Sequence, residues 1–559
     1  MQPDQPGRAR GGALMSAADG VVATSSSAPL LRVAGLSVTY RGRRGVHQAV
    51  RGVSLDVARG EVVALVGESG SGKTTIGRTI LGLLPASAER YGAVELDGAD
   101  LLRLPDRRRR RVLGARIATI PQDPLAALNP VQRIGPQVAE VLAIHGLASG
   151  DAARARALEA LRLAGLDDAE ARYRQYPHEL SGGQRQRVLI AIAIVAGPEL
   201  IVADEPTSAL DVTVQRRILD HLEHLVRETG TSLLLITHDL GVAGDRADRV
   251  VVLSDGEVVE QGATGAVLER PEQPYTRALL EATPDRRPPA TPPPSAGSSD
   301  SPALEVRGLG RTFHVTGRPP VTAADDVSFT IPRGGALGLV GESGSGKTTT
   351  ARIVLGLLRP DAGEVLVDGR VQDSPAEIRR ARRFVQPVFQ DPYSSLSPHQ
   401  SIASSIAEPL RALGGGNRAE RRARVAELLD RVHLPASVGR RRPTELSGGQ
   451  LQRVAIARAL AIHPRLVVCD EPVSSLDVSV QARVLDVLAE LREQDGLALL
   501  FISHDLAVVR AVCEDVAIMR AGRIVEQGRT LDVFASPASP YTAELLAAIP
   551  GRRTAAAVA

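Results

Sequence analysis

Cysteine and aromatic residues are scarce in this chain, and their scarcity excludes several classes of protein. The 559 residues include two cysteines and no tryptophan, and aromatic residues make up 2%. Two cysteines are too few for a disulfide framework, a four-cysteine zinc site or an iron–sulfur cluster. So few aromatic rings argue against binding of single-stranded nucleic acid by base stacking. The net charge of +3 also argues against a strongly basic nucleic-acid binder.

Long apolar runs are also missing. The longest apolar stretch covers residues 188–198, well short of the roughly 20 residues that cross a bilayer. Residues 1–29 lack the apolar core of a secretory signal, and we expect them to be a disordered tail. The alternative is that the start is mis-assigned and that translation begins at Met15. If the protein acts at a membrane, we therefore expect it to do so through partner proteins.

Lysine is the scarcest charged residue. Of the 67 basic residues only Lys73 and Lys347 are lysines, and the rest are arginines, a bias that a GC-rich genome would produce. Codon bias does not explain why both lysines lie in copies of one octapeptide, GESGSGKT. We infer that this position requires a compact ammonium group and not a planar guanidinium.

Six motifs occur twice, in the same order. This repetition predicts two homologous domains, at 30–283 and 303–559. Residues 284–302 between them contain seven prolines and predict a semi-extended linker that lets the domains face each other. The motifs begin as follows: GESGSGKT at Gly67 and Gly341, QDP at Gln122 and Gln390, LSGGQ at Leu180 and Leu446, DEP at Asp204 and Asp470, HDL at His238 and His504, and PYT at Pro274 and Pro540.

Each copy alternates short apolar runs with helical segments. The runs ELIVADEP, RLVVCDEP, SLLLITHD and ALLFISHD all end in polar residues. Apolar strands whose carboxyl ends carry polar residues are typical of parallel sheets with functional groups at one edge. The sequence therefore predicts two α/β domains, each with a mainly parallel central sheet.

The octapeptide has the pattern of a P-loop between a strand and a helix. Its glycines allow backbone amides and the helix N-terminus to approach phosphate oxygens. We expect Lys73 and Lys347 to reach the β- and γ-phosphates of ATP, and Thr74 and Thr348 to offer hydroxyls to Mg²⁺. The other residues expected in this site are Gly67, Gly70, Gly72, Thr75, Gly341, Gly344, Gly346 and Thr349. The two copies of this loop therefore predict two tandem P-loop NTPase domains.

Paired acids end a strand in each copy. Asp204 and Asp470 are expected to hold Mg²⁺, directly or through water. The adjacent Glu205 and Glu471 are candidate general bases for the attacking water, a role worth roughly 10²–10⁴ in rate. Such acids can also simply cap a helix, but behind a P-loop the functional interpretation is favoured.

The LSGGQ pentapeptides resemble the signature of the ATP-binding subunits of ABC transporters, and the resemblance runs from about residue 30 onward outside the linker. It implies head-to-tail packing of the two domains, each with an antiparallel β subdomain and a helical signature subdomain. Each ATP would lie between one domain's P-loop and the other's signature, where amides at a helix N-terminus form a second phosphate cradle. The signature residues are Ser181, Gly182, Gly183, Ser447, Gly448 and Gly449.

The same resemblance assigns further roles in each copy, and the residues that carry them are intact in both, which predicts two hydrolytic sites. The aromatic residues Tyr40 and Phe313 would stack on adenine, with simple core packing as the alternative. The histidines His238 and His504 would contact the γ-phosphate and position the water and the glutamate.

The same resemblance also assigns roles to two glutamines and two loops. Gln122 and Gln390 would touch Mg²⁺ and couple to membrane subunits. The loops at 208–211 and 474–477 would cross between the sites, where Asp211 and Asp477 would form hydrogen bonds.

The segments QDPLAALNP, QDPYSSLSP, PEQPYTRALL and SPASPYTAELL resemble the branch that imports peptides, oligopeptides and nickel. Gln273 and Ser539 replace a histidine of that pattern. The resemblance implies ATP and Mg²⁺ as ligands, two integral permease subunits and an extracellular solute-binding protein as partners, and a peripheral place on the cytoplasmic face of the membrane. Dipeptides or oligopeptides lead as solutes, with nickel, glutathione-like and other small solutes open.

Two alternative functions remain at this point: the ATPase of an exporter, and a soluble tandem ATPase acting on ribosomes. The linker is Pro-rich and not a long charged helix, which argues against the second. Basic runs at 107–111 and 379–383 are interpreted as solvated helix faces, with contact to lipid or to a membrane subunit as the alternative.

Overall fold

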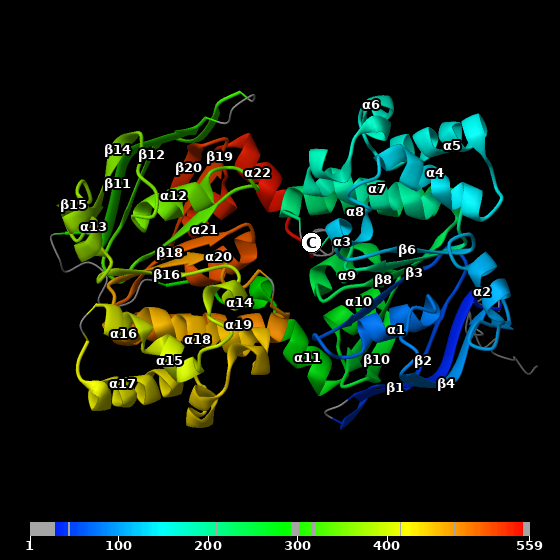
Figure 1. Ribbon diagram of the computed structural model, residues 1–559, viewed down its shortest axis with the longest axis horizontal. Helices are drawn as coiled ribbons and strands as arrows, with labels where there is room; N and C mark the ends of the chain where they lie inside the picture. The colour runs from blue at the N-terminus through cyan, green and yellow to red at the C-terminus, as the bar shows by residue number, and fades with distance from the viewer. Residues whose placement is uncertain are drawn as a thin grey trace, which may run out of the picture.

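The computed structural model describes residues 28–42, 45–207, 210–291, 301–314, 319–413, 415–474 and 476–551. It contains two similar halves, each with a four-stranded antiparallel sheet, a six-stranded mixed sheet and a group of helices beside them (Figure 1). The predicted fold class is thereby confirmed, including the antiparallel and helical subdomains. The proposed tail at 1–29 lies outside the described residues except for its last two.

In the first half, the central sheet has the order β10-β9-β3-β8-β7-β6, and only the β9–β10 pair is antiparallel. The strands are β1 (Leu31–Gly42), β2 (Gly45–Val57), β3 (Val62–Gly67), β4 (Ala88–Leu96), β5 (Ala99–Asp100), β6 (Ile117–Ile120), β7 (Leu200–Asp204), β8 (Ser232–Ile236), β9 (Arg249–Ser254) and β10 (Glu257–Ala263). The helices are α1 (Lys73–Ile80), α2 (Asp106–Val112), α3 (Pro124–Ala127), α4 (Ile134–Ile144), α5 (Gly150–Leu163), α6 (Ala169–Arg174), α7 (Gly182–Ile194), α8 (Val212–Thr229), α9 (Leu240–Arg246), α10 (Thr264–Glu269) and α11 (Pro274–Glu281).

The second half repeats this topology, with the central order β16-β17-β18-β13-β19-β20. Its strands are β11 (Leu304–Phe313), β12 (Val321–Ile331), β13 (Ala336–Val340), β14 (Ala362–Val367), β15 (Arg370–Val371), β16 (Val385–Val388), β17 (Leu466–Asp470), β18 (Ala498–Ser503), β19 (Asp515–Arg520) and β20 (Arg523–Arg529). Its helices are α12 (Lys347–Val354), α13 (Pro375–Ala381), α14 (Pro392–Ser395), α15 (Ile402–Ile406), α16 (Glu408–Ala412), α17 (Arg418–Arg431), α18 (Gly448–Ala459), α19 (Val478–Asp495), α20 (Leu506–Val512), α21 (Thr530–Ala535) and α22 (Pro540–Ala547).

Burial explains why the apolar runs form the central strands. Every residue of β3, β8 and β13 is buried, because helices cover one face of each central sheet and the antiparallel sheet with the P-loop helix covers the other. β7 and β17 are buried until their last residue, the aspartate of each DEP motif. Since β3, β7 and β8 are parallel neighbours, their carboxyl ends bring the P-loop, DEP and HDL motifs to one edge.

The two halves are arranged head to tail (Figure 1). The helix after the second P-loop, α12, and the first signature helix, α7, both lie in the upper part of the view, whereas α1 and α18 lie in the lower part. Each P-loop helix is therefore on the same side of the molecule as the signature helix of the other half.

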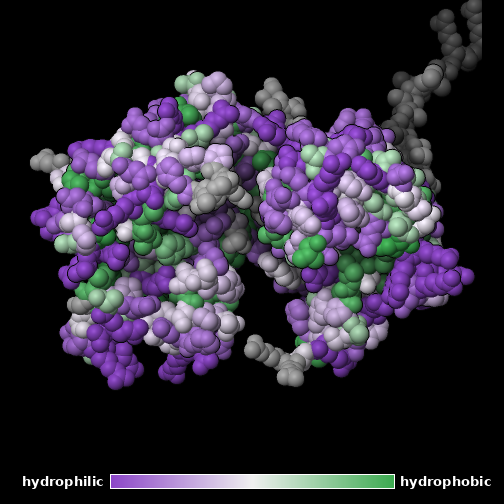
Figure 2. All heavy atoms as spheres, turned by 45° about the horizontal axis from the view of Figure 1, so that its top comes forward, coloured by the Kyte–Doolittle hydropathy of each residue, from purple (hydrophilic) through white to green (hydrophobic). Residues whose placement is uncertain are grey.

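The surface is mostly hydrophilic in the face that Figure 2 shows. Helix α2, which carries the first basic run, has no buried residue, as expected for a solvated helix face. In the part of the chain that the structure describes, no helix is both long and apolar enough to span a bilayer.

The described beginning of the predicted linker is docked on the second half. Residues Pro284–Arg286 form a short 3₁₀ turn, η2. Arg287 forms an ion pair with Asp486 of α19, and the Ala290 amide donates to the Arg510 carbonyl at 2.9 Å. Residues 284–291 are therefore held against α19 and α20 by hydrogen bonds and an ion pair. Their composition alone predicts only a spacer.

Candidate active site

Each P-loop needs glycine at two positions where the backbone is crowded. Gly67 has φ +148°, and a Cβ there would collide with the Leu253 carbonyl oxygen of β9. Gly72 has φ +100°, and its Cβ would lie 2.5 Å from the Ala49 carbonyl oxygen. The second loop repeats both conflicts at Gly341 and Gly346. The loop can therefore wrap closely around a phosphate group because neither position carries a side chain.

The two lysines lie inside their own loops. Lys73 Nζ donates to the carbonyl oxygens of Gly67 and Glu68, both at 2.7 Å, and Lys347 makes the same pair of bonds at 2.7 and 2.8 Å. Burial lowers the pKa of both ammonium groups, and the negative charges of the nearby acids, led by Glu205 and Glu471 respectively, oppose that shift. A compact cation is thus held next to the amides that would receive phosphates.

In each half, two of the three predicted magnesium residues, the threonine and the aspartate, lie together, whereas the glutamine contacts the neighbouring glutamate. Thr74 Oγ1 lies 3.4 Å from Asp204 Oδ1. Burial, followed by the charge of Glu205, raises the pKa of Asp204, and burial with Glu471 does the same for Asp470. A buried carboxylate charge is costly unless a cation compensates it. Together with the neighbouring hydroxyl, this carboxylate provides the hard oxygen donors that Mg²⁺ prefers. The residues present therefore fit this ion.

The neighbouring glutamates are held in a left-handed backbone conformation, with φ +46° at Glu205 and +48° at Glu471. Their amides donate to the carbonyls of Ile236 and Ile502, at 2.8 and 3.0 Å, which secures that conformation. Non-glycine residues adopt it at a cost, and such strain concentrates at functional sites.

Both carboxylate oxygens of Glu205 are hydrogen-bonded. Gln122 Nε2 donates to Oε2 at 2.8 Å, and His238 Nδ1 lies 2.9 Å from Oε1. Burial favours a higher pKa for Glu205, but the bond and charge of His238 outweigh it and lower the pKa overall. The pKa of His238 is raised, because the bond to Glu205 and its charge exceed the effect of burial.

The second half has the same triad. Gln390 Nε2 donates to Glu471 Oε2 at 2.9 Å, and His504 Nδ1 lies 3.3 Å from Oε1. The pKa of Glu471 is lowered and that of His504 raised for the corresponding reasons. Two equivalent ionised glutamates are therefore available at neutral pH.

One cavity of about 1050 Å³ between the halves collects most of the predicted residues. Tyr40 and Phe313 line it, although the Arg311 guanidinium covers one face of the Phe313 ring at 5.1 Å. The signature residues 181–183 and 447–449 are not among its lining residues. The other predicted residues on its wall are Gly70, Gly72, Lys73, Thr74, Thr75, Gln122, Glu205, Asp211, His238, Gly344, Gly346, Lys347, Thr348, Thr349, Gln390, Glu471, Asp477 and His504.

Contacts between the halves join each P-loop to the segment that follows the DEP motif of the other half. The Ser69 amide of the first P-loop donates to Asp477 Oδ1 at 2.9 Å. Thr213 Oγ1, at the start of α8, donates to Glu342 Oε1 of the second P-loop at 2.6 Å. The sequence predicts that the loops at 208–211 and 474–477 contact the opposite half. Ser208 and Ser475 of these loops lie outside the described residues. Thr213 carried no sequence signal of its own, and Glu342 carried none beyond its place in the second GESGSGKT motif.

Two models of known protein families match the sequence of this chain. The model described as "ABC transporter" matches residues 50–208 and 324–474, which together form more than half of the chain. The chain belongs to the ABC transporter ATP-binding proteins. Proteins of this family hydrolyse ATP, so this chain is an ATPase. A second model, "Oligopeptide/dipeptide transporter, C-terminal region", matches residues 259–313 and 525–557, where the two PYT elements lie.

Several curated ABC proteins are similar over nearly their whole length. "Oligopeptide transport ATP-binding protein OppD" of Mycobacterium tuberculosis is 42% identical, with 93% of this chain and 98% of that protein covered. "Peptidoglycan transport ATP-binding protein YejF" of Agrobacterium fabrum is 45% identical, with 94% and 97% covered. "Glutathione import ATP-binding protein GsiA" of Salmonella typhimurium is 41% identical, with 94% and 90% covered. The expected resemblance to the peptide-importer branch is therefore confirmed, and the fused arrangement is shared with these relatives.

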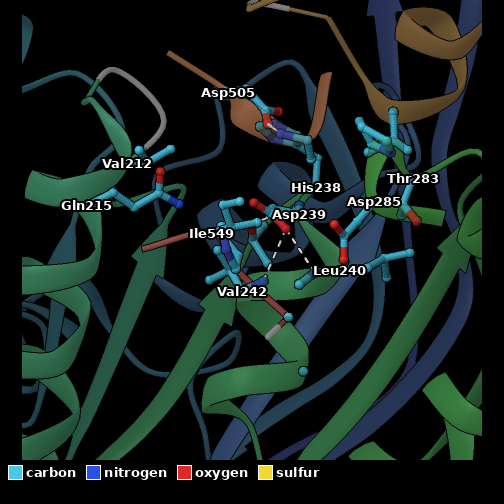
Figure 3. A pocket seen from close by; sticks show the side chains of 18 of the residues that line it. Val212, Gln215, His238, Asp239, Leu240, Val242, Thr283, Asp285, Asp505 and Ile549 are labelled. Atoms are coloured by element: carbon cyan, nitrogen blue, oxygen red, sulfur yellow. Dashed lines mark hydrogen bonds between the residues drawn. The ribbon is translucent and has the colours of Figure 1, made fainter. Parts of the chain in front are cut away.

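A second cavity of this ABC ATPase, about 580 Å³, lies between the halves beside the HDL motifs (Figure 3). Asp239 points along its wall and caps α9 by accepting from the amides of Gly241 and Val242 at 2.8 and 3.1 Å. Asp505 caps α20 in the same way. Thr283 and Ile549, from the segments that follow α11 and α22, also line this cavity. The end of each half thus reaches the seam between them.

Proposed function

We propose that this chain is the ATP-hydrolysing, energy-coupling subunit of a bacterial importer for dipeptides or oligopeptides. The observation that carries the proposal is the pair of equivalent lysine, threonine, glutamate and histidine sets on the wall of one interdomain cavity. The match of both chain segments that contain PYT to the oligopeptide/dipeptide transporter region supports the solute class.

The proposed nucleotide site uses the P-loop amides and lysine of each half for the phosphates. Tyr40 and Phe313 stack on adenine. Thr74, Gln122 and Asp204 hold Mg²⁺ in the first half, and Thr348, Gln390 and Asp470 do so in the second. The bound ion would neutralise charge on the phosphate oxygens during transfer. Closure of the halves would add the signatures of 181–183 and 447–449 to the opposite P-loops, and the head-to-tail arrangement supports this step.

The proposed hydrolysis uses Glu205 and Glu471 as general bases. Each glutamate is ionised and can accept a proton from the attacking water, while its histidine partner orients it. In each half, the glutamine also donates to this carboxylate. If Gln122 or Gln390 turned away when nucleotide bound, that oxygen would become free for the attacking water.

The proposed transport cycle links these events to the membrane. ATP binding closes the two halves, and hydrolysis with product release reopens them. ATP can shift this equilibrium only through its higher affinity for the closed state. Two integral permease subunits would dock on the chain at the cytoplasmic face of the membrane, and an extracellular binding protein would deliver the solute.

The hydrolytic part is tested with Glu205→Gln combined with Glu471→Gln. We expect the variant to bind ATP with near-normal affinity and to lose at least about a hundredfold in turnover, because the phosphate site stays intact while the base is removed. Turnover within threefold of the unmodified chain would remove both residues from this role.

The import part is tested by expressing the chain with two permeases and a solute-binding protein encoded beside it. Uptake of labelled di- or oligopeptides into cells, lost in the double glutamine variant, is the expected result. Outward movement of solute, or a complete system without a binding protein, would instead indicate an exporter.

A further inference from the structure

The second PYT element contacts the second P-loop. Tyr541, the second residue of α22, is buried, with 4% of its surface exposed. Its hydroxyl oxygen accepts a hydrogen bond of 3.1 Å from the amide of Glu342, the second residue of the second GESGSGKT loop. The Arg520 guanidinium lies over the Tyr541 ring at 4.7 Å from its centre. The aromatic ring is thus fixed on one side while its hydroxyl supports the loop.

A glutamate on the sheet fixes the start of each PYT helix. Glu526 of β20 accepts from the amides of Ala538 and Ser539, at 2.8 and 3.0 Å. In the first half, Glu260 of β10 accepts from the amides at 272 and 273, at 2.9 and 3.2 Å. The position of Tyr541 is therefore set by the central sheet and does not depend on a flexible terminus.

Glu342 is a junction between three parts of the molecule. Its amide donates to Tyr541, its carbonyl accepts from Lys347 at 2.8 Å, and its carboxylate accepts from Thr213 of the first half at 2.6 Å. A change in the position of this one residue would therefore reach the lysine that faces the phosphates.

The other end of α22 also contacts the first half. Glu544 forms an ion pair of 2.5 Å with Arg217, and the Ala547 carbonyl accepts a hydrogen bond from Arg216. Both arginines lie on α8, which begins one residue before Thr213 and packs beside α22 (Figure 1). Helix α22 consequently joins α8 of the first half to the P-loop of the second.

We propose that Tyr541 is a positioning residue for ATP binding at the second P-loop, and that α22 links the position of the first half's α8 to that loop. Removing the hydroxyl leaves the partly buried Glu342 amide without its partner, so the loop loses its preference for the conformation that holds Lys347 in place. The effect falls on nucleotide binding, because Tyr541 contacts the loop and not the glutamate base. This inference rests on the ATPase activity of the family and not on the proposed solute.

The test uses the full chain with Tyr541→Phe, which removes only the hydroxyl. Lys73→Ala with Glu471→Gln silences the first site and blocks hydrolysis, so that fluorescent ATP reports binding at the second site. We expect Tyr541→Phe to raise the Kd for ATP three- to tenfold in this background. In the otherwise unmodified chain we expect a higher KM for ATP and a kcat within twofold. Tyr91→Phe, at a tyrosine that is 65% exposed, is the matched control and should change neither value.

A second arm tests the link through α22 at the surface, where folding is not at risk. Arg217→Ala should weaken ATP binding at the second site about twofold, and should add little to Tyr541→Phe, because both changes act on one connected path. An unchanged Kd in Tyr541→Phe, or a tenfold fall in kcat at constant KM, would overturn the positioning role. Full additivity of the two changes, or no effect of Arg217→Ala, would overturn the link. None of these readouts requires a permease or a solute.

Discussion

The carboxylate of Asp477, in the second half, accepts a 2.9 Å hydrogen bond from the backbone amide of Ser69 in the first half's P-loop. Burial raises the pKa of Asp477, whereas the charges of His238 and Lys73 across the interface oppose that shift. Asp477, which follows the second DEP motif, thus lies close to His238 and Lys73 of the first half. This contact joins the first half's P-loop to the second half.

We predict that cysteines at Ser69 and Asp477 will form a disulfide within one chain in the absence of nucleotide. Residues joined by a short side-chain-to-backbone bond lie within the range that a disulfide can bridge. The crosslinked band should run as a monomer on a non-reducing gel, and each single cysteine variant should give no such band. Crosslinks found only between separate chains would mean that the two halves of one chain do not face each other.

Lys73→Arg should cripple the first site although it keeps the positive charge. Lys73 is 6% exposed, and its ammonium group donates to two carbonyl oxygens at 2.7 Å. A planar guanidinium is larger and cannot take the same place without moving the loop. ATP binding at this site should fall at least about tenfold, measured in a Lys347→Ala background. Normal affinity would show that codon usage alone explains the distribution of lysine.

Arg492→Met should strongly destabilise the second half. Arg492 and Glu514 form a buried ion pair of 2.6 Å, and Glu514 also accepts from the Ala336 amide at the start of β13. Without the arginine, Glu514 is a buried charge with no counter-ion, which costs about 3–5 kcal/mol. Chemical denaturation should show this loss.

The control for that experiment is Arg529→Met, which removes an exposed partner of Asp515. Exposed pairs contribute about 0–1 kcal/mol, so this variant should unfold almost normally. Equal destabilisation by the two variants would contradict the importance of the buried pair.

Both thiols should resist alkylation in the folded protein. Burial raises the pKa of Cys469 to about 12, with a further contribution from Asp470. Burial also raises the pKa of Cys513 well above its usual value. Because the thiolate is the reactive form, a raised pKa leaves very little of it at pH 8. Iodoacetamide should label neither residue until guanidinium is added, and rapid labelling of the native chain would contradict this burial.

Repetition and local pattern were enough to predict the fold class and the positions of the motifs. Apolar runs that end in DEP or HDL can form buried strands only in parallel sheets covered on both faces, so their polar ends must meet at one edge. The P-loop followed from its glycines and lysine, because few other residues permit that backbone near a phosphate. These features are local in sequence, or recur at matching positions in the two copies.

Which residues pair across the halves could be found only in the tertiary structure. Asp477 with Ser69 and Thr213 with Glu342 each join residues more than a hundred positions apart. No periodicity or spacing encodes such pairs, because they depend on how two finished domains pack. The sequence thus determined which chemical groups each half presents. Packing of the halves decided which of those groups meet, since side-chain contacts across an interface form only after both surfaces exist.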